Sequence, residues 1–102
     1  MATKAIDSVQ GDAWSPRESG EIARIRDALH ERGLATACEH GITDEGDPWT
    51  VFYERQSSRS VAHLTRDRGT YLFVLGDRRP IRASDLGSFV KVVRASPPGL
   101  LA

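Results

Sequence analysis

Three short segments rich in strand-forming residues, separated by brief polar turns, constrain the fold of this chain most strongly. Residues 49–54 and 60–65 alternate between two sides. The third segment, residues 70–75, contains the continuously apolar run 71–75, which is typical of a strand in the middle of the sheet or covered on both faces. Residues 56–59 and 66–69 carry the serine, arginine and glycine residues of tight turns. Because each connection is so short, the pattern predicts a three-strand antiparallel meander.

A helical pattern precedes this meander. Ser15 and Glu18 have the spacing of a capping box, and Pro16 occupies the first helical position, where its missing N–H costs nothing. Gly33 and Leu34 are placed to end the helix in a Schellman motif. The apolar face is predicted from four residues at helical spacing: Ile22, Ile25, Ala28 and Leu29.

A second helical pattern follows the meander. Ser84 is the expected N-cap, and two prolines after Ser96 stop the helix. Its apolar positions are Leu86, Phe89, Val90 and Val93. We therefore predict an α+β two-layer sandwich, ordered helix, three-strand antiparallel meander, helix, with both helices on one face. Residues 1–13 are predicted as a flexible N-terminal segment, 14–95 as a single domain and 96–102 as a flexible tail.

Composition places the chain among ordinary globular domains. A length of 102 residues fits one domain, and the 27% charged residues are close to the usual fraction. The longest apolar runs are far shorter than the ~20 residues of a membrane helix, and residues 1–9 lack the apolar core of a signal peptide. The one cysteine fits a reducing compartment. We expect a cytoplasmic protein without a membrane partner.

Two resemblances follow from these patterns. The expected element order resembles that of double-stranded RNA-binding domains, which hold phosphates with lysines at the start of the last helix. Here that helix opens with Ala83, Ser84, Asp85 and Leu86. Separately, the run CEHGITDEGDPW with the following VFYER, residues 38–55, is similar to a segment of small uncharacterised bacterial proteins. That second resemblance implies no activity.

The formal charge of zero conceals a division along the chain. Residues 1–53 carry five lysine and arginine residues against ten acidic ones, whereas residues 54–102 carry nine against four. The basic half could bind an anionic partner, or the two halves could simply attract each other on folding. A nucleic-acid-binding module is therefore one alternative, through Arg55, Arg59, Arg66, Arg68, Arg78, Arg79 and Arg82. Because these arginines are spread over loops, we expect such binding to be weak.

Chemistry-bearing side chains concentrate in residues 38–49. Cys38 and His40, two positions apart, point the same way in an extended segment, and Asp44 or Asp47 could complete a transition-metal site. A second close ligand pair is missing, so we expect no metal and no cofactor. Calcium-loop spacing is also missing. A thiol nucleophile would need His30, His40 or His63 as its base, without any family signature.

Paired carboxylates in the same segment, such as Glu45 and Asp47, could do acid–base work. A small domain with three strands offers no obvious deep pocket for such chemistry. The simplest interpretation is that Thr43 and Asp44 or Asp47 accept backbone hydrogen bonds and fix a turn. These features favour a binding or regulatory module over an enzyme.

The face occupied by Trp49 decides where a binding surface could lie. The usual burial of large aromatics favours Trp49, Val51 and Tyr53 in the core. In the other register these residues share the exposed face with His63 and form a recognition surface. We expect a protein-interaction module that uses residues 38–49 and the adjacent sheet, with an unknown protein partner and an unknown oligomeric state. The candidate binding residues are Glu39, His40, Glu45, Trp49 and His63.

Overall fold

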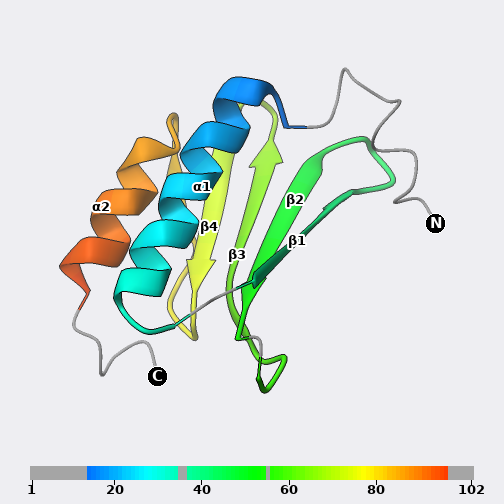
Figure 1. The fold of residues 1–102 in the computed structure, drawn as a ribbon. Coiled ribbons are helices and arrows are strands. Elements are labelled where there is room, and N and C mark those ends of the chain that lie inside the picture. Colours follow the sequence, from blue (N-terminus) through cyan, green and yellow to red (C-terminus); the bar gives the residue numbers. More distant parts are fainter. Residues whose placement is uncertain (1–13, 35–36, 55, 97–102) are drawn as a thin grey trace.

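Two helices and one antiparallel sheet make up the part of the chain described by the computed structural model, residues 14–34, 37–54 and 56–96 (Figure 1). The elements in chain order are α1 (Pro16–Glu31), β1 (Ala37–Ile42), β2 (Pro48–Tyr53), β3 (Ser60–Asp67), β4 (Thr70–Leu75), β5 (Ile81–Ala83) and α2 (Gly87–Ala95). The five strands lie side by side in the order β1-β2-β3-β4-β5. The predicted α+β class and the helix–sheet–helix order are confirmed.

The sheet is wider than the predicted three-strand meander, because β1 and β5 add one strand at each edge. β1 pairs with the whole of β2, from Ala37 opposite Tyr53 to Ile42 opposite Pro48. β5 has only three residues and pairs with β4. Neither segment shows a clear apolar alternation in the sequence, so both depend on a neighbouring strand for their conformation.

Local signals define α1 at both ends, as predicted. The Ser15 side chain accepts a hydrogen bond from the Glu18 N–H at 3.1 Å, and Glu18 accepts one from the Ser15 N–H at 2.9 Å. At the other end Gly33 has a φ of +74°, and the Leu34 N–H donates to the Leu29 carbonyl at 3.0 Å. These bonds are the capping box and the Schellman motif expected from the sequence.

The start of α2 differs from the prediction. The helix begins at Gly87, and the Asp85 carboxylate, not Ser84, accepts the hydrogen bond from the Ser88 N–H at 2.9 Å. Serine and aspartate are both residue types that favour helix N-termini, so the sequence does not distinguish Ser84 from Asp85. Because β5 extends to Ala83, the helix starts later than predicted. The predicted apolar face is nevertheless correct, since Leu86, Phe89, Val90 and Val93 are all buried.

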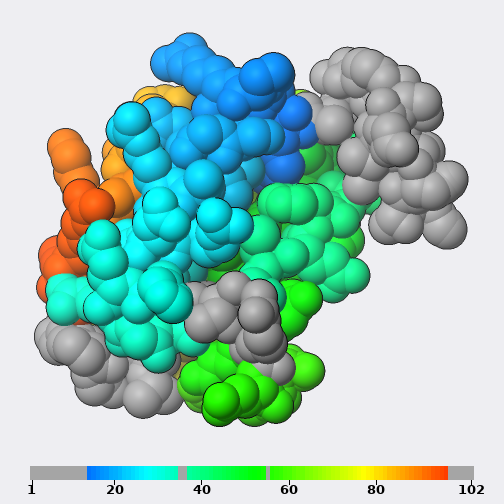
Figure 2. Space-filling view, in the orientation of Figure 1, coloured from blue at the N-terminus to red at the C-terminus, as the bar shows by residue number. Residues whose placement is uncertain are grey.

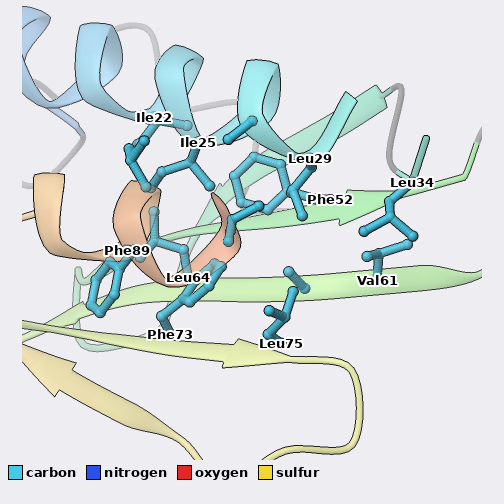
Figure 3. Close-up of a cluster of buried hydrophobic side chains, with 14 of the residues drawn as sticks. Ile22, Ile25, Leu29, Leu34, Phe52, Val61, Leu64, Phe73, Leu75 and Phe89 are labelled. Atoms are coloured by element: carbon cyan, nitrogen blue, oxygen red, sulfur yellow. The ribbon is translucent and has the colours of Figure 1, made fainter. Parts of the chain in front are cut away.

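The core lies between the sheet and both helices, which cover the same face (Figures 1 and 3). Ile25 and Leu29 of α1 and Phe89 of α2 are fully buried. Phe73 and Phe89 stack with their ring centroids 4.9 Å apart. The sheet contributes Phe52, Ala62, Leu64, Phe73 and Leu75 to this core.

Phe52 and Thr50, rather than Trp49, Val51 and Tyr53, face the helices, and both are fully buried. The expectation that Trp49 lies in the core is therefore wrong. Successive residues of a strand point to opposite faces, so burial of Phe52 puts Trp49 and Val51 on the other side.

Some predictions concern residues at the chain ends. Residues 1–13 and 97–102, predicted to be flexible, lie outside the described residues. Ser96, the first residue of the predicted tail, is buried, and its hydroxyl donates to the Val92 carbonyl at 2.9 Å. In the part of the chain that the structure describes, neither helix combines the length and apolar character required to cross a membrane.

Candidate functional site

Two rows of side chains cross the face of the sheet that points away from the helices. The first row runs through Glu39, Val51, His63 and Val74. The second row runs through Gly41, Trp49, Thr65, Leu72 and Arg82. Tyr53 follows Val51 of the first row at the end of β2. We call the surface formed by these two rows and Tyr53 the open face.

The open face is apolar on β2 and β4, on either side of the central β3, and no described element covers it. Trp49, Val51 and Tyr53 of β2 and Leu72 and Val74 of β4 are all partly exposed, in contrast to the fully buried residues that alternate with them. His63 is exposed between them on β3. Several uncovered apolar side chains on one face of a small domain are typical of a binding surface.

Trp49 lies directly on Gly41 of the neighbouring strand. A Cβ atom added to Gly41 would come within 2.1 Å of Cζ2 and 2.4 Å of Cε2 of the indole. Gly41 is therefore required for the indole to lie flat against the backbone of β1, and the ring buries Gly41 in return. This packing fixes the orientation of the largest side chain of the open face.

The loop between β1 and β2 is held by Thr43. The Thr43 N–H donates to the Asp47 carbonyl at 2.8 Å, and the Thr43 hydroxyl accepts from the Asp47 N–H at 3.0 Å. Thr43, Asp44 and Asp47 are the residues predicted to fix this turn with their side chains, and of these Thr43 accepts a backbone hydrogen bond. Within the described residues, the carboxylates of Asp44, Glu45 and Asp47 make no hydrogen bond or ion pair, and Asp44 and Glu45 are exposed.

His40 lies on the helix side of the sheet, opposite to Glu39 and His63. Its Nδ1 atom is 2.7 Å from the Thr50 hydroxyl, which also accepts a hydrogen bond from Trp14 Nε1 at 2.8 Å. His40 as a residue is nevertheless exposed. Loss of water around the ring and, secondarily, the nearby Arg26 lower the pKa of His40, so the imidazole is neutral at neutral pH.

Cys38 and His40 share this helix side, as their spacing predicts, with Sγ 3.8 Å from Nε2. His63 lies on the open face and His30 on the exposed surface of α1, so His40 is the histidine closest to the thiol. Asp44 and Asp47 lie in the hairpin loop beyond β1. Within the described ranges, no three histidine, cysteine or acidic side chains gather in a way that could hold a metal ion.

A second polar cluster ties the start of α1 to β3 and β4. Glu18 accepts hydrogen bonds from Arg66 at 2.8 Å and from the Tyr71 hydroxyl at 2.6 Å. Burial alone raises the pKa of Glu18, but the bonds from the Ser15 N–H, Tyr71 and Arg66 outweigh it and hold the pKa below its ordinary value of 4.5. Arg66 also lies over the Trp14 ring, 5.8 Å from its centroid. The cluster is a structural clamp.

Figure 2 shows the helix side of the molecule, where α1 crosses the front. Two grooves of about 530 Å³ each adjoin α1 and the start of α2, and both are lined by Glu21, Asp85 and Gly87. Each groove combines the shared acidic residues Glu21 and Asp85 with basic ones. The first also contains Arg17, Glu18 and Arg66, and the second also contains Arg24, Lys91 and Arg94. This mixture does not select a cationic or an anionic ligand.

The arginines of the nucleic-acid alternative do not gather on one surface. Arg59, Arg78 and Arg79 lie at the end of the sheet where β3 begins and β4 ends. Arg66, Arg68 and Arg82 lie toward the other end, about 25 Å away along the eight residues of β3. Several of them are already engaged, Arg59 with Glu54 and Arg66 with Glu18. Arg55 lies outside the described residues.

Comparison of the chain with protein-family models, with curated proteins and with solved structures finds no match in any of the three.

The predicted binding residues therefore separate into three places. Glu39, Trp49 and His63 share the open face, His40 lies on the helix side and Glu45 is in the β1–β2 loop. Sequence reasoning missed the contributions of Leu72 and Val74, because an uninterrupted apolar run does not reveal which of its residues face outward. The pairing of Gly41 with Trp49 is the signal that could have assigned the indole to the open face, because a glycine opposite leaves room for the ring.

Proposed function

We propose that this chain is a protein-binding module and that the open face is its binding surface. The observation that carries the proposal is the uncovered set of apolar side chains on both sides of the central strand, Trp49 and Val51 on β2 and Leu72 and Val74 on β4. Burial of the exposed part of such a partly buried side chain contributes about 0.5–1 kcal/mol. The four side chains can therefore supply several kcal/mol to a complex, part of which offsets the cost of association.

The charge of the open face supports a protein partner over a nucleic acid. A phosphate backbone requires several cations on one surface, because each neutralised phosphate contributes to affinity. Arg82 is the one arginine among the described residues of the open face, and Glu39 lies on the same face. Arg82 is also close to Asp67, at 3.9 Å. Aromatic and apolar side chains with charges only at the rim are typical of protein interfaces.

The rigidity of the surface supports the same function. Trp49 is fixed against Gly41, and β2 is anchored from behind by Thr50 and Phe52. A preorganised aromatic loses little freedom on binding, which favours affinity. We propose the cytoplasm as the compartment, in keeping with the single cysteine.

A photoreactive side chain at position 51 tests this function. In the native cells, a benzoyl-phenylalanine in place of Val51 should crosslink to a protein, whereas the same group in place of Ser19, exposed on α1, should not. Val74→Asp in the first variant should abolish the crosslink, because it places a charge in the same row of the open face, two strands from the probe. Circular dichroism would verify that all three proteins are folded. Equal crosslinking from positions 51 and 19, or a crosslink unaffected by Val74→Asp, would contradict the proposal.

A further inference from the structure

The part of the open face around Trp49 presents an aromatic ring next to free carboxylates. The indole lies on Gly41 of β1, and within the described residues no second aromatic ring stacks on it and no cation lies over it. Glu39 is two residues before Gly41 on the same strand, so both lie on the open face, about 7 Å apart along β1. The Glu39 side chain makes no hydrogen bond or ion pair with any described residue, and the residue is exposed.

Asp47 places a second carboxylate on the other side of Trp49. The Thr43 N–H donates to the Asp47 carbonyl at 2.8 Å, so the pairing of β1 with β2 continues one step past Gly41 and Trp49. Because alternate residues of a strand share a face, Asp47 lies on the same side of the sheet as Trp49. Like the other two carboxylates of this loop, that of Asp47 has no hydrogen-bond or ion-pair partner among the described residues.

The arginine of the open face does not neutralise these carboxylates. Arg82 lies on the opposite edge strand and is held by its own chain, with Nη1 2.7 Å from the Thr70 hydroxyl and 3.9 Å from the Asp67 carboxylate. Asp67 and Thr70 continue the alternation of β3 and β4 and also lie on the open face, so Arg82 and Asp67 largely neutralise each other there. The described surface around Trp49 is therefore left with negative charge.

We infer that this part of the open face binds an arginine side chain of the partner protein. A guanidinium is planar, stacks on the face of an aromatic ring and pairs with carboxylates through a fork of N–H donors. Trp49 supplies the ring, and Glu39 and Asp47 supply a carboxylate on either side of it. Apolar side chains of the same segment cover Leu72 and Val74 on β4. The inference rests on the proposed function, since it states which kind of protein segment the open face recognises.

A library of random peptides displayed on phage tests the chemistry of the partner before its identity is known. The immobilised full chain should enrich peptides that combine arginine with apolar residues, and Trp49→Ala should remove this enrichment. Glu39→Gln combined with Asp47→Asn should also remove it, because the side chains keep their size but lose their charge. Asp27→Asn combined with Glu31→Gln removes the same charge from the exposed surface of α1 and should leave the enrichment unchanged. Circular dichroism would verify that every variant is folded.

The affinity of one enriched peptide then measures the contribution of the arginine charge. Replacement of its arginine by citrulline, which has a similar shape without the charge, should raise the Kd for the unaltered chain about tenfold. In the variant that lacks the carboxylates of Glu39 and Asp47, the same replacement should raise the Kd only about threefold, since the ring alone remains. Salt raised from about 50 mM to about 500 mM should weaken the arginine peptide more than the citrulline peptide.

Enriched peptides without an excess of arginine, or no enrichment at all, overturn the inference. An equal effect of citrulline on the unaltered chain and on the variant without the two carboxylates overturns it as well. The crosslinking experiment separates this failure from failure of the proposed function. If position 51 captures a protein in cells while the library shows no preference for arginine, the open face binds a protein through other chemistry. If position 51 captures no more than position 19, the proposed function fails and the inference fails with it.

Discussion

Gly41→Ala provides the sharpest test of how the open face is built. An alanine in a strand usually stabilises a protein relative to glycine, but the packing of Trp49 on Gly41 should make this substitution destabilising. Within a strand, alanine is normally more stabilising than glycine by about 0.5–1 kcal/mol, since glycine loses more conformational freedom on folding. Here the added Cβ would lie 2.1 Å from Cζ2, 2.4 Å from Cε2 and 2.8 Å from Nε1 of Trp49. Contacts between carbon atoms are favourable near 3.5–4.0 Å, so the indole must move by more than an ångström.

The magnitude follows from the two opposing terms. Forcing a group into a packed contact costs about 1–3 kcal/mol, and the alanine preference offsets about 0.5–1 kcal/mol of that. We therefore expect Gly41→Ala to lower the free energy of unfolding by about 1–2 kcal/mol. Gly20→Ala is the matched control, because the structure places nothing within 4 Å of a Cβ at that exposed helical position. That control should stabilise the protein by about 0.5–1 kcal/mol.

Urea unfolding followed by circular dichroism measures both effects, and a double-mutant cycle identifies their cause. In a Trp49→Ala background the clash is absent, so Gly41→Ala should become neutral or stabilising. A stabilising effect of Gly41→Ala in the unaltered protein would refute the packing of the indole on Gly41. So would an equal loss of stability in both backgrounds.

Three further outcomes are expected from the local contacts. Thr43→Ala should lower the unfolding free energy by about 1 kcal/mol in urea titrations, because the Asp47 N–H loses its acceptor, whereas Asp44→Ala should have almost no effect. Gly33→Ala should cost about 1 kcal/mol, since an alanine at a φ of +74° is strained even though its Cβ meets nothing; wild-type stability would contradict the observed helix end. The pKa of Glu18 is lower in the folded state than its ordinary value of 4.5, so its stabilising effect is present above pH 4.5 and is lost as the pH falls through the folded pKa. Glu18→Gln should therefore lose less stability than the unaltered protein between pH 6 and pH 3 in thermal melts, and parallel pH profiles would argue against this linkage.

The elements that are predictable from the sequence are those whose signals are local. α1 is predictable at both ends because its capping box and its glycine stop each involve residues within a few positions of one another. β4 is likewise predictable over its full range, residues 70–75. β1 and β5 are not, because pairing with a neighbouring strand, rather than their own composition, gives them an extended conformation.

The candidate site is predictable only in part, for a related reason. Both sides of β2 carry aromatics, Phe52 on one and Trp49 and Tyr53 on the other, so alternation could not select the buried side. Long-range packing determines which side of β2 is buried. Phe52 fits under Ile25 and Leu29 of α1, while Trp49 fits on Gly41, a partner that becomes visible only when β1 is known to be a strand (Figure 3).

The two faces of β2 depend on each other. On the helix side, Thr50 is buried and accepts a hydrogen bond from Trp14, which stacks against Tyr71 with its centroid 6.3 Å away. This contact is made where the strand passes the beginning of α1, and it fixes β2 relative to the helix layer. Trp49 and Val51 flank Thr50 in the strand and point to the opposite face. The hydrogen bond between Trp14 and Thr50 therefore also fixes the position of these two side chains on the open face. The polar groups near His40 therefore support the binding surface from behind without forming part of it.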